Sequence, residues 1–385
     1  MNRRELLAAL PAGALMLQAE SAVSQSAKRA PGTARLLIGT GGRGSKGVYA
    51  AYLSNGHLSD PTLAVEAANP SFLAIPSQAY PAFFAVTQPE NLTSHASSFT
   101  HPPMSDRPGE QFQHISDAAS ERVGGCHVGV TSDGHAVFVA NYGGASVASF
   151  HADDAGTLTL ASHIDFPPDG HGPNPDRQKQ SYIHSALSSP DGNYVLVNDL
   201  GLDRIHIFRL DRATAKLTPH GEWHAAPGSG PRHLAIHPNG HWIYCIHELN
   251  STVALLQWDS SKGTLTTLGT PVPTLPNDLD VSKSRACELA FSRDLKYLYA
   301  STRVNEYFTT YSIDAHTGAL TLIQHLPNPG KESRHIAVSP DGKYFLSANQ
   351  FSDDVSVFPI DTTTGKLSER TAMVKLGGPS CLLFA

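Results

Sequence analysis

The residues whose side chains are best suited to catalysis or binding recur at one position of a repeated unit. Each unit begins with a short strand, and aligning the copies gives a series that is aromatic, titratable or a thiol throughout: Phe72, His127, His184, His233, Glu288, His335 and Cys381. Further polar residues precede this series or end the following strands: Arg232, Arg334, Asp199, His247, Glu248, Arg303 and Gln350. If equivalent residues meet at one axis, imidazoles, guanidinium groups and a carboxylate share one concavity. Such a set is typical of a catalytic pocket that binds an anion.

Other interpretations of these residues stay open at this level. Any single histidine can simply form a hydrogen bond with a neighbouring repeat, because buried polar groups are mostly paired. A metal site is less favoured, since the histidines and Glu288 come from different repeats and form no short ligand motif. The chain contains neither G-x-S-x-G nor H-E-x-x-H, so it is not predicted to be a serine esterase or a zincin.

The repeated unit is a β-hairpin. In residues 228–253 a strand at 232–236 is followed by Pro238-Asn239-Gly240 and a second strand at 242–246. Asn-Gly between alternating strands is a strong hairpin signal. The other copies cover residues 71–88, 126–142, 183–200, 287–303 and 334–350. Their turns are 47 to 58 residues apart, a period that predicts a propeller of four-stranded blades.

We expect seven blades in an all-β fold. Six hairpin copies lie inside the chain, and residues 379–384 begin a seventh that ends before its partner strand. The strand at residues 35–39 can supply that partner, so both ends of the chain would share one blade and close the ring. Two longer segments, 89–125 and 167–180, interrupt the pattern, and the second carries Arg177. Long ordered loops in compact repeats are often functional.

Composition limits the classes of function and location. A net charge of −6 without a dense Lys/Arg block argues against nucleic-acid binding. Residues 1–24 resemble an export signal of the twin-arginine kind, followed by a linker at 25–33 and one propeller domain at 34–385. We therefore expect a periplasmic or otherwise exported protein, with no membrane span in the mature chain. The four cysteines, Cys126, Cys245, Cys287 and Cys381, are widely spaced, and free structural thiols are preferred to disulfides.

One glycine-rich motif is not interpreted as a binding site. Residues 39–44 match G-x-G-x-x-G, but the next residues, 47–53, alternate as a strand rather than a helix. A β-turn is therefore preferred to a phosphate-binding loop.

The most specific segments resemble a known family. These segments are Gly230-Pro231-Arg232-His233, Glu248-Leu249-Asn250-Ser251, Asn174-Pro175-Asp176-Arg177-Gln178, Asp199-Leu200-Gly201-Leu202-Asp203-Arg204 and Asn141-Tyr142-Gly143-Gly144. In these residues the chain is similar to the lactonase family of seven-bladed propellers, which includes propeller-type 6-phosphogluconolactonases and carboxy-cis,cis-muconate cyclases. The likeness extends over roughly residues 36–384. It implies catalytic roles for His184, Arg232, Glu248 and Arg303.

From this resemblance we expect a hydrolase that opens a sugar lactone, either 6-phosphogluconolactone-like or unphosphorylated, since an exported enzyme would not meet cytoplasmic sugar phosphates. His184 is the preferred general base, oriented or assisted by Glu248, and Arg303 and Arg232 would stabilise the oxyanion or bind an acidic group. The expected substrate-binding residues are Arg177, His233, Asn250, Asp199, Arg334 and Gln350. No metal or other cofactor is expected, and the protein is expected to be a monomer. A muconate-type cycloisomerase and a non-catalytic binding propeller are the alternatives.

Overall fold

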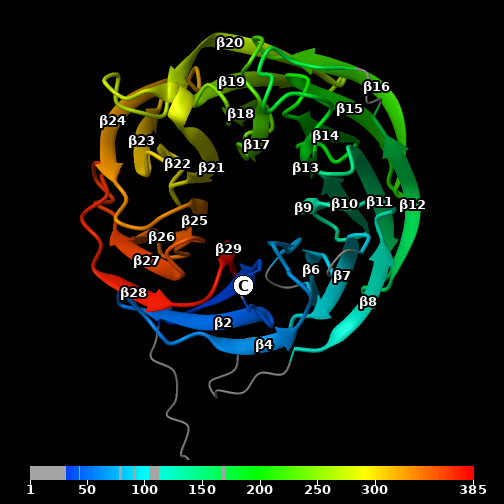
Figure 1. The fold of residues 1–385 in the computed structure, drawn as a ribbon, viewed down its shortest axis with the longest axis horizontal. Coiled ribbons are helices and arrows are strands. Elements are labelled where there is room, and N and C mark those ends of the chain that lie inside the picture. Colours follow the sequence, from blue (N-terminus) through cyan, green and yellow to red (C-terminus); the bar gives the residue numbers. More distant parts are fainter. Residues whose placement is uncertain (1–31, 43, 78–79, 90–91, 104–111, 167–169) are drawn as a thin grey trace, which may run out of the picture.

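The computed structural model describes residues 32–42, 44–77, 80–89, 92–103, 112–166 and 170–385. They form seven antiparallel sheets around a central axis, as Figure 1 shows, which confirms the prediction of an all-β propeller. Within these ranges the helical structure is limited to one 3-10 turn, η1 (Val281–Lys283), and there is no helix with the length and apolar character needed to cross a membrane. The predicted export signal and most of the linker lie outside the described residues.

Each sheet contributes one strand to every concentric layer. The innermost strands are β5 (Phe72–Ala74), β9 (Gly125–Val130), β13 (Ile183–Ser188), β17 (Pro231–Ile236), β21 (Arg285–Phe291), β25 (Ser333–Val338) and β29 (Pro379–Phe384). The second strands are β6 (Ala82–Thr87), β10 (Ala136–Asn141), β14 (Tyr194–Asp199), β18 (Trp242–His247), β22 (Tyr297–Arg303), β26 (Tyr344–Asn349) and β1 (Ala34–Thr40).

The outer half of each sheet is a second hairpin. The third strands are β7 (His95–Thr100), β11 (Ser146–Ala152), β15 (Arg204–Asp211), β19 (Thr252–Asp259), β23 (Tyr307–Ile313), β27 (Asp354–Pro359) and β2 (Gly47–Ser54). The outermost strands are β8 (His114–Ala119), β12 (Leu158–Asp165), β16 (Lys216–His224), β20 (Thr264–Pro273), β24 (Leu320–Pro327), β28 (Ala372–Lys375), and the pair β3 (His57–Leu58) and β4 (Thr62–Glu66).

The two ends of the described chain share one blade. The C-terminal strand β29 pairs antiparallel with β1, with Leu36 opposite Phe384 and Ile38 opposite Leu382. This pairing confirms the predicted closure and satisfies two strand edges that would otherwise be open. The next element after the glycine-rich residues 39–44 is a strand, β2, which begins at Gly47, and not a helix, so this segment connects two strands, as predicted.

Residues 89–125 are not the interruption that the sequence indicated. They contain β7 and β8, which pair with His95 opposite Ala119 and complete an ordinary blade. The alternation is weak because the buried positions of β7 include Ala96, Ser97 and Ser98 in place of large apolar residues. Residues 90–91 and 104–111 lie outside the described residues.

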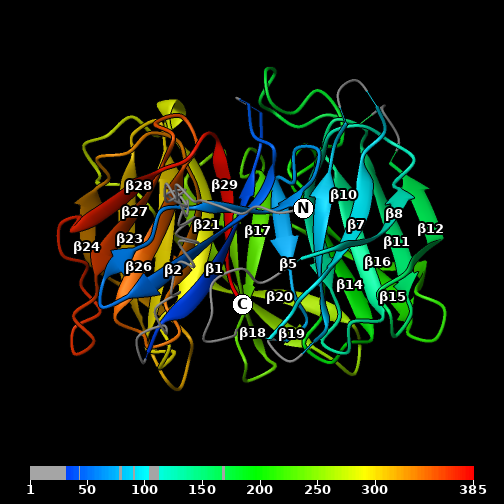
Figure 2. The same ribbon diagram turned by 90° about the horizontal axis from the view of Figure 1, so that it is seen from below.

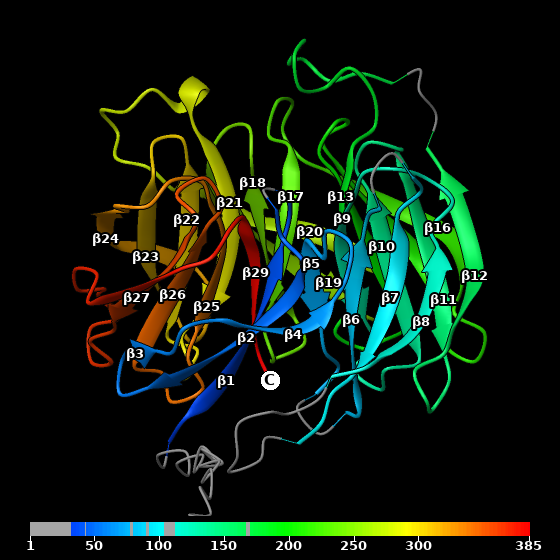
Figure 3. The same cartoon turned by 60° about the horizontal axis from the view of Figure 1, so that its bottom comes forward.

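Neighbouring blades are joined by apolar cores and by tyrosines that reach across the blade boundary. The hydroxyl groups of Tyr244 and Tyr299 donate to the carbonyl oxygens of Gly318 and Gly365 in the next blade, over 2.7 and 3.0 Å. Figures 2 and 3 show that η1 and the loop before β13 rise on the same face, whereas the C-terminus lies towards the other. The stacked blades therefore form a rigid frame for the loops on the first face.

Candidate active site

Glu248 is the point at which three arginines converge. It follows the last strand residue of β18, and its side chain is only 1% exposed. Its Oε1 accepts from the Nη2 of Arg177 over 2.6 Å, while its Oε2 lies 2.9 Å from Arg303 Nη2 and 3.2 Å from Arg232 Nε. These arginines come from the loop before β13, the end of β22 and the start of β17. Three parts of the ring thus share one buried carboxylate.

Burial and the arginines act in opposite directions on the pKa of Glu248. Removal from water would raise the pKa, but Arg303, Arg232 and Arg177 together lower it from 4.5 to about 2. Glu248 is therefore ionised at neutral pH and is a poor proton acceptor. Its charge holds the arginines in place.

Strand pairing explains why certain residues point into the site. At the start of four inner strands the register skips one residue, which leaves Cys126, His184, Arg232 and Arg334 without a cross-strand partner. An extra residue of this kind re-aims its side chain, and such bulges are common beside active sites. We call this set the bulge residues.

The sequence alignment of His184 was wrong by one residue. The register places Ser185, rather than His184, with His127, His233 and His335. His184 belongs with the bulge residues, and this is why it reaches the cavity. Counting back from the turns gives the same answer, because Ser185 stands seven residues before Gly192, as His127 stands seven before Gly134. A one-residue shift changes the direction of a side chain.

The remaining aligned residues form a plug on the axis. The Phe72 ring lies 4.4 Å from that of His127, 5.3 Å from that of His335 and 5.5 Å from that of His233, measured between centroids. His233 Nδ1 lies 2.7 Å from Glu288 Oε2. The predicted meeting of repeat-equivalent residues is therefore present for these five, whereas Cys381 packs against Leu73, and none of the six lines the cavity.

His184 is a neutral imidazole between the plug and Glu248. Its Nε2 is 3.8 Å from Glu248 Oε2, and its Nδ1 is 3.9 Å from the thiol of Cys126. Burial, followed by the charge of Arg232 and the proximity of His233, holds the pKa of His184 well below 6.5. The side chain is only 7% exposed, so its protonated form is strongly disfavoured at neutral pH.

A cavity of about 340 Å³ opens above these groups. Its wall is formed by Gln88, Gly124, Gly125, Cys126, Tyr142, Gly143, Arg177, His184, Glu248, Arg285, Arg303 and Arg334. Four of these side chains are guanidinium groups and one is a carboxylate, so positive charge is in excess. The cavity therefore favours an anionic ligand.

Of the four cavity arginines, Arg285 is exposed, and Arg334 is the least compensated of the three that are withdrawn from solvent. Among the described residues its guanidinium makes no hydrogen bond or ion pair, whereas Arg177 and Arg303 both contact Glu248. Burial, together with the charges of Arg303 and Arg232, lowers the pKa of Arg334 from its usual value. A bound anion would relieve this repulsion.

Four predicted binding residues do not line the cavity. Asp199 is fully buried and accepts hydrogen bonds from the backbone N–H groups of Tyr182, Gly201 and Leu202, so it stabilises the local chain. It pairs as the last strand residue, one position before the equivalent of Glu248, which is Leu200. Its placement gives no support for the predicted substrate contact.

The other three residues also have local contacts. Asn250 donates to Ser229 and accepts from Thr252 within its own blade. His233 belongs to the axial plug, and Gln350 lies beside Gly41. Arg232 is 2% exposed and meets the site through Glu248 rather than through the cavity wall.

Other cavity residues were not predicted from the sequence. Cys126 is a bulge residue and could have been found from the same column as Arg232 and Arg334. Tyr142 occupies the same turn position as Glu248 and receives a hydrogen bond from Arg177 over 3.3 Å. Gln88 occupies the same position after β6 as Gln350 does after β26, so it could have been found from that column. Arg285 gave no repeat signal, because β21 begins one residue earlier than its equivalents.

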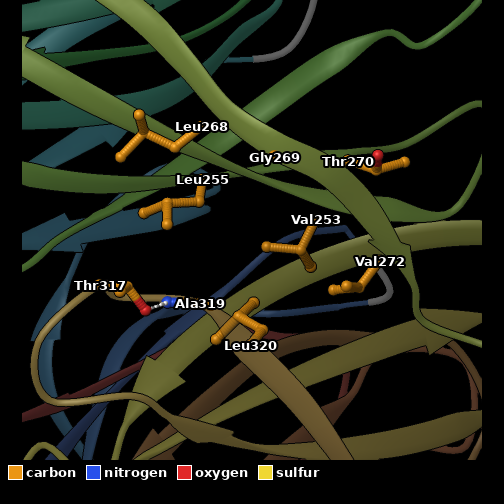
Figure 4. A pocket seen from close by; sticks show the side chains of 9 residues that line it. All are labelled: Val253, Leu255, Leu268, Gly269, Thr270, Val272, Thr317, Ala319 and Leu320. Atoms are coloured by element: carbon orange, nitrogen blue, oxygen red, sulfur yellow. Dashed lines mark hydrogen bonds between the residues drawn. The ribbon is translucent and has the colours of Figure 1, made fainter.

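A second cavity of about 320 Å³ lies between the outer strands of two blades. Figure 4 shows its wall, which includes Val253, Leu255, Leu268, Val272 and Leu320. No acidic, basic or thiol side chain lines it, so it offers no group that could activate water. Among the described residues there is also no cluster of three or more His, Cys, Asp or Glu side chains arranged to hold a metal ion. All four cysteines are free thiols, as preferred from the sequence.

Comparisons with known proteins agree with this geometry. Residues 35–384 match the family model described as "Lactonase, 7-bladed beta-propeller". A probable 6-phosphogluconolactonase of Arthroderma benhamiae is 34% identical over 64% of each chain, and a 6-phosphogluconolactonase of Bacillus subtilis is 25% identical over 89% of this chain and 95% of its own. The structure of a periplasmic gluconolactonase of Pseudomonas aeruginosa superposes with a TM-score of 0.83, at 27% identity, over 92% of this chain and 99% of its own. The chain therefore belongs to the lactonase family of seven-bladed β-propellers.

Proposed function

We propose that the protein hydrolyses the ring ester of a sugar lactone that carries an acidic group. The observation that carries this proposal is the cavity itself, in which a neutral imidazole and an excess of guanidinium groups face the same space. Relatives named 6-phosphogluconolactonase and a structural neighbour described as a gluconolactonase support the reaction class.

His184 is the proposed general base. Its neutral form removes a proton from water, the water oxygen attacks the lactone carbonyl, and the imidazolium returns the proton to the ring oxygen as the C–O bond breaks. Its low pKa makes it a weak base but keeps it deprotonated. Arg303 is the proposed donor to the oxyanion because it combines a cavity position with a fixed contact to Glu248.

The other charged residues have supporting roles in this proposal. Glu248 holds the guanidinium groups of the reaction centre, Arg232 is a further counter-ion of Glu248, and Arg177 lines the cavity from the loop before β13. Arg334, for which the described part of the chain provides no counter-ion, binds the acidic group of the substrate, either phosphate or carboxylate. No step in this scheme uses a metal or another cofactor.

The predicted export signal bears on the choice of substrate. An exported enzyme would meet unphosphorylated aldonolactones more readily than phosphorylated ones, whereas the cationic cavity favours the phosphorylated or otherwise acidic compounds. Phosphorylated and neutral lactones of the same ring size should therefore be compared directly.

The test measures acid release from such a panel, corrected for spontaneous ring opening. We expect the acidic lactones to be opened fastest, with the rate lost in His184→Ala and Arg303→Met and unchanged in His241→Ala, which removes an exposed histidine. A wild-type protein that opens no lactone, or site variants that keep the full rate, would contradict the proposal. Loss of ultraviolet absorbance from a conjugated diacid would instead identify a cycloisomerase.

A further inference from the structure

Arg303 has a second carboxylate partner that lies outside the cavity wall. Its Nη1 donates to Oε1 of Glu332 over 2.6 Å, while its Nη2 lies 2.9 Å from Glu248 Oε2. Glu332 belongs to the segment between β24 and β25, and its side chain is 13% exposed. The two terminal nitrogens of one guanidinium group are thus held by carboxylates from two different blades.

The backbone of Glu332 has an uncommon conformation. Its φ is 59°, in the left-handed region that a residue with a side chain seldom adopts. Its N–H donates to Glu306 Oε1 over 2.6 Å, and its carbonyl oxygen accepts from Gln350 N over 2.9 Å. The surroundings therefore hold a conformation that the residue alone disfavours, and strain of this kind is concentrated at functional sites.

We propose that Glu332 is a positioning residue that fixes the guanidinium of Arg303 in the orientation needed at the reaction centre, and that Glu306 holds the backbone that presents it. This inference rests on the proposed function. Arg334 follows Glu332 by two residues in the same segment. The backbone of this segment therefore helps to place Arg334 in the cavity wall, while the Glu332 side chain orients Arg303. The side chain of Glu332 does not itself line the cavity, and it acts on the reaction through its contact with Arg303.

The test combines two substitutions with a double-mutant cycle. Glu332→Gln removes the charge, and Glu332→Asn also shortens the side chain while suiting a positive φ. We expect each to lower kcat about tenfold, since a hydrogen bond to a charged group contributes roughly that factor, with KM changed less than about twofold. In an Arg303→Lys background, Glu332→Gln should not lower kcat any further, because the guanidinium through which the Glu332 side chain acts is absent.

Glu369→Gln is the matched control, because it removes the same charge from an exposed position. Melting temperatures near that of the wild type would show that the Glu332 variants are folded. The inference is overturned if folded Glu332→Asn keeps the wild-type kcat, or if Glu332→Gln lowers kcat by the same factor in the wild-type and Arg303→Lys backgrounds. Either result with an active wild-type enzyme leaves the lactonase proposal intact, whereas an inactive wild type removes the basis for both.

Discussion

Replacing Glu248 by Gln should destabilise the protein because it removes the negative charge that three arginines share. Its pKa falls from 4.5 to about 2 on folding, and each unit corresponds to about 1.4 kcal/mol, so the ionised carboxylate contributes about 3 kcal/mol at neutral pH. For a chain of this size, that loss corresponds to roughly a 4 °C fall in melting temperature. Because Glu248 is almost fully buried, solvent screening reduces this contribution little.

The stabilisation by ionised Glu248 should depend on pH, and the sign of this dependence can be tested. A lowered pKa means that the stabilisation is complete above pH 4.5 and is lost as the pH falls towards 2. Unfolding of wild type, Glu248→Gln and the exposed control Glu369→Gln should be followed in urea from pH 8 to pH 3. We expect the difference in unfolding free energy between wild type and Glu248→Gln to be constant above pH 5 and to become smaller below pH 4.5. Equal stability at pH 7, or a gap that widens in acid, would refute the role of Glu248 as the shared counter-ion.

Three further predictions concern the cavity and the thiols. Because the pKa of His184 lies well below 6.5, kcat/KM should be flat through neutrality and fall only in more acidic solution; an acid limb at pH 6.5 or above would contradict a neutral base. Arg334→Met should raise KM for acidic lactones about tenfold and leave neutral lactones unaffected, whereas an equal effect on both would exclude an anion-binding role. Ellman's reagent should titrate four thiols after unfolding without reductant but at most Cys126 in the native protein, since burial raises the pKa of Cys126 to about 11 and that of Cys381 to about 12; fewer than four would reveal a disulfide.

The scaffold could be predicted from the sequence because its signals are local and repeated. The Asn-Gly turn at Gly240 and its equivalents mark four of the six internal hairpins, and the incomplete hairpin at residues 379–384 requires the N-terminal strand. The turn with Leu295 in place of glycine was found by spacing, and the structure gives it a φ of 61°. Repetition thus compensates for a weak individual copy.

The direction of individual side chains could not be obtained in the same way. Bulges at the starts of the inner strands shift the register by one residue, and a turn-based alignment does not detect them. The placement of His184 was a separate error of one residue, because it stands eight residues before Gly192 and the other histidines of the column stand seven before their turn residues. Asp199 was included although it is the last paired strand residue and not the one after it. Glu332 carried no signal at all, because its importance depends on a side-chain contact with Arg303 that no motif or repeat position marks.

The most direct measurement is a crystal structure with the hydrolysed acid product of the best lactone, determined beside the unliganded protein. We expect one molecule in the cavity, with its new carboxylate near His184 and Arg303 and its other acidic group on Arg334. Product bound in the second cavity, between β20 and β24, or spread over separate surface sites, would contradict a single reaction centre built from several blades.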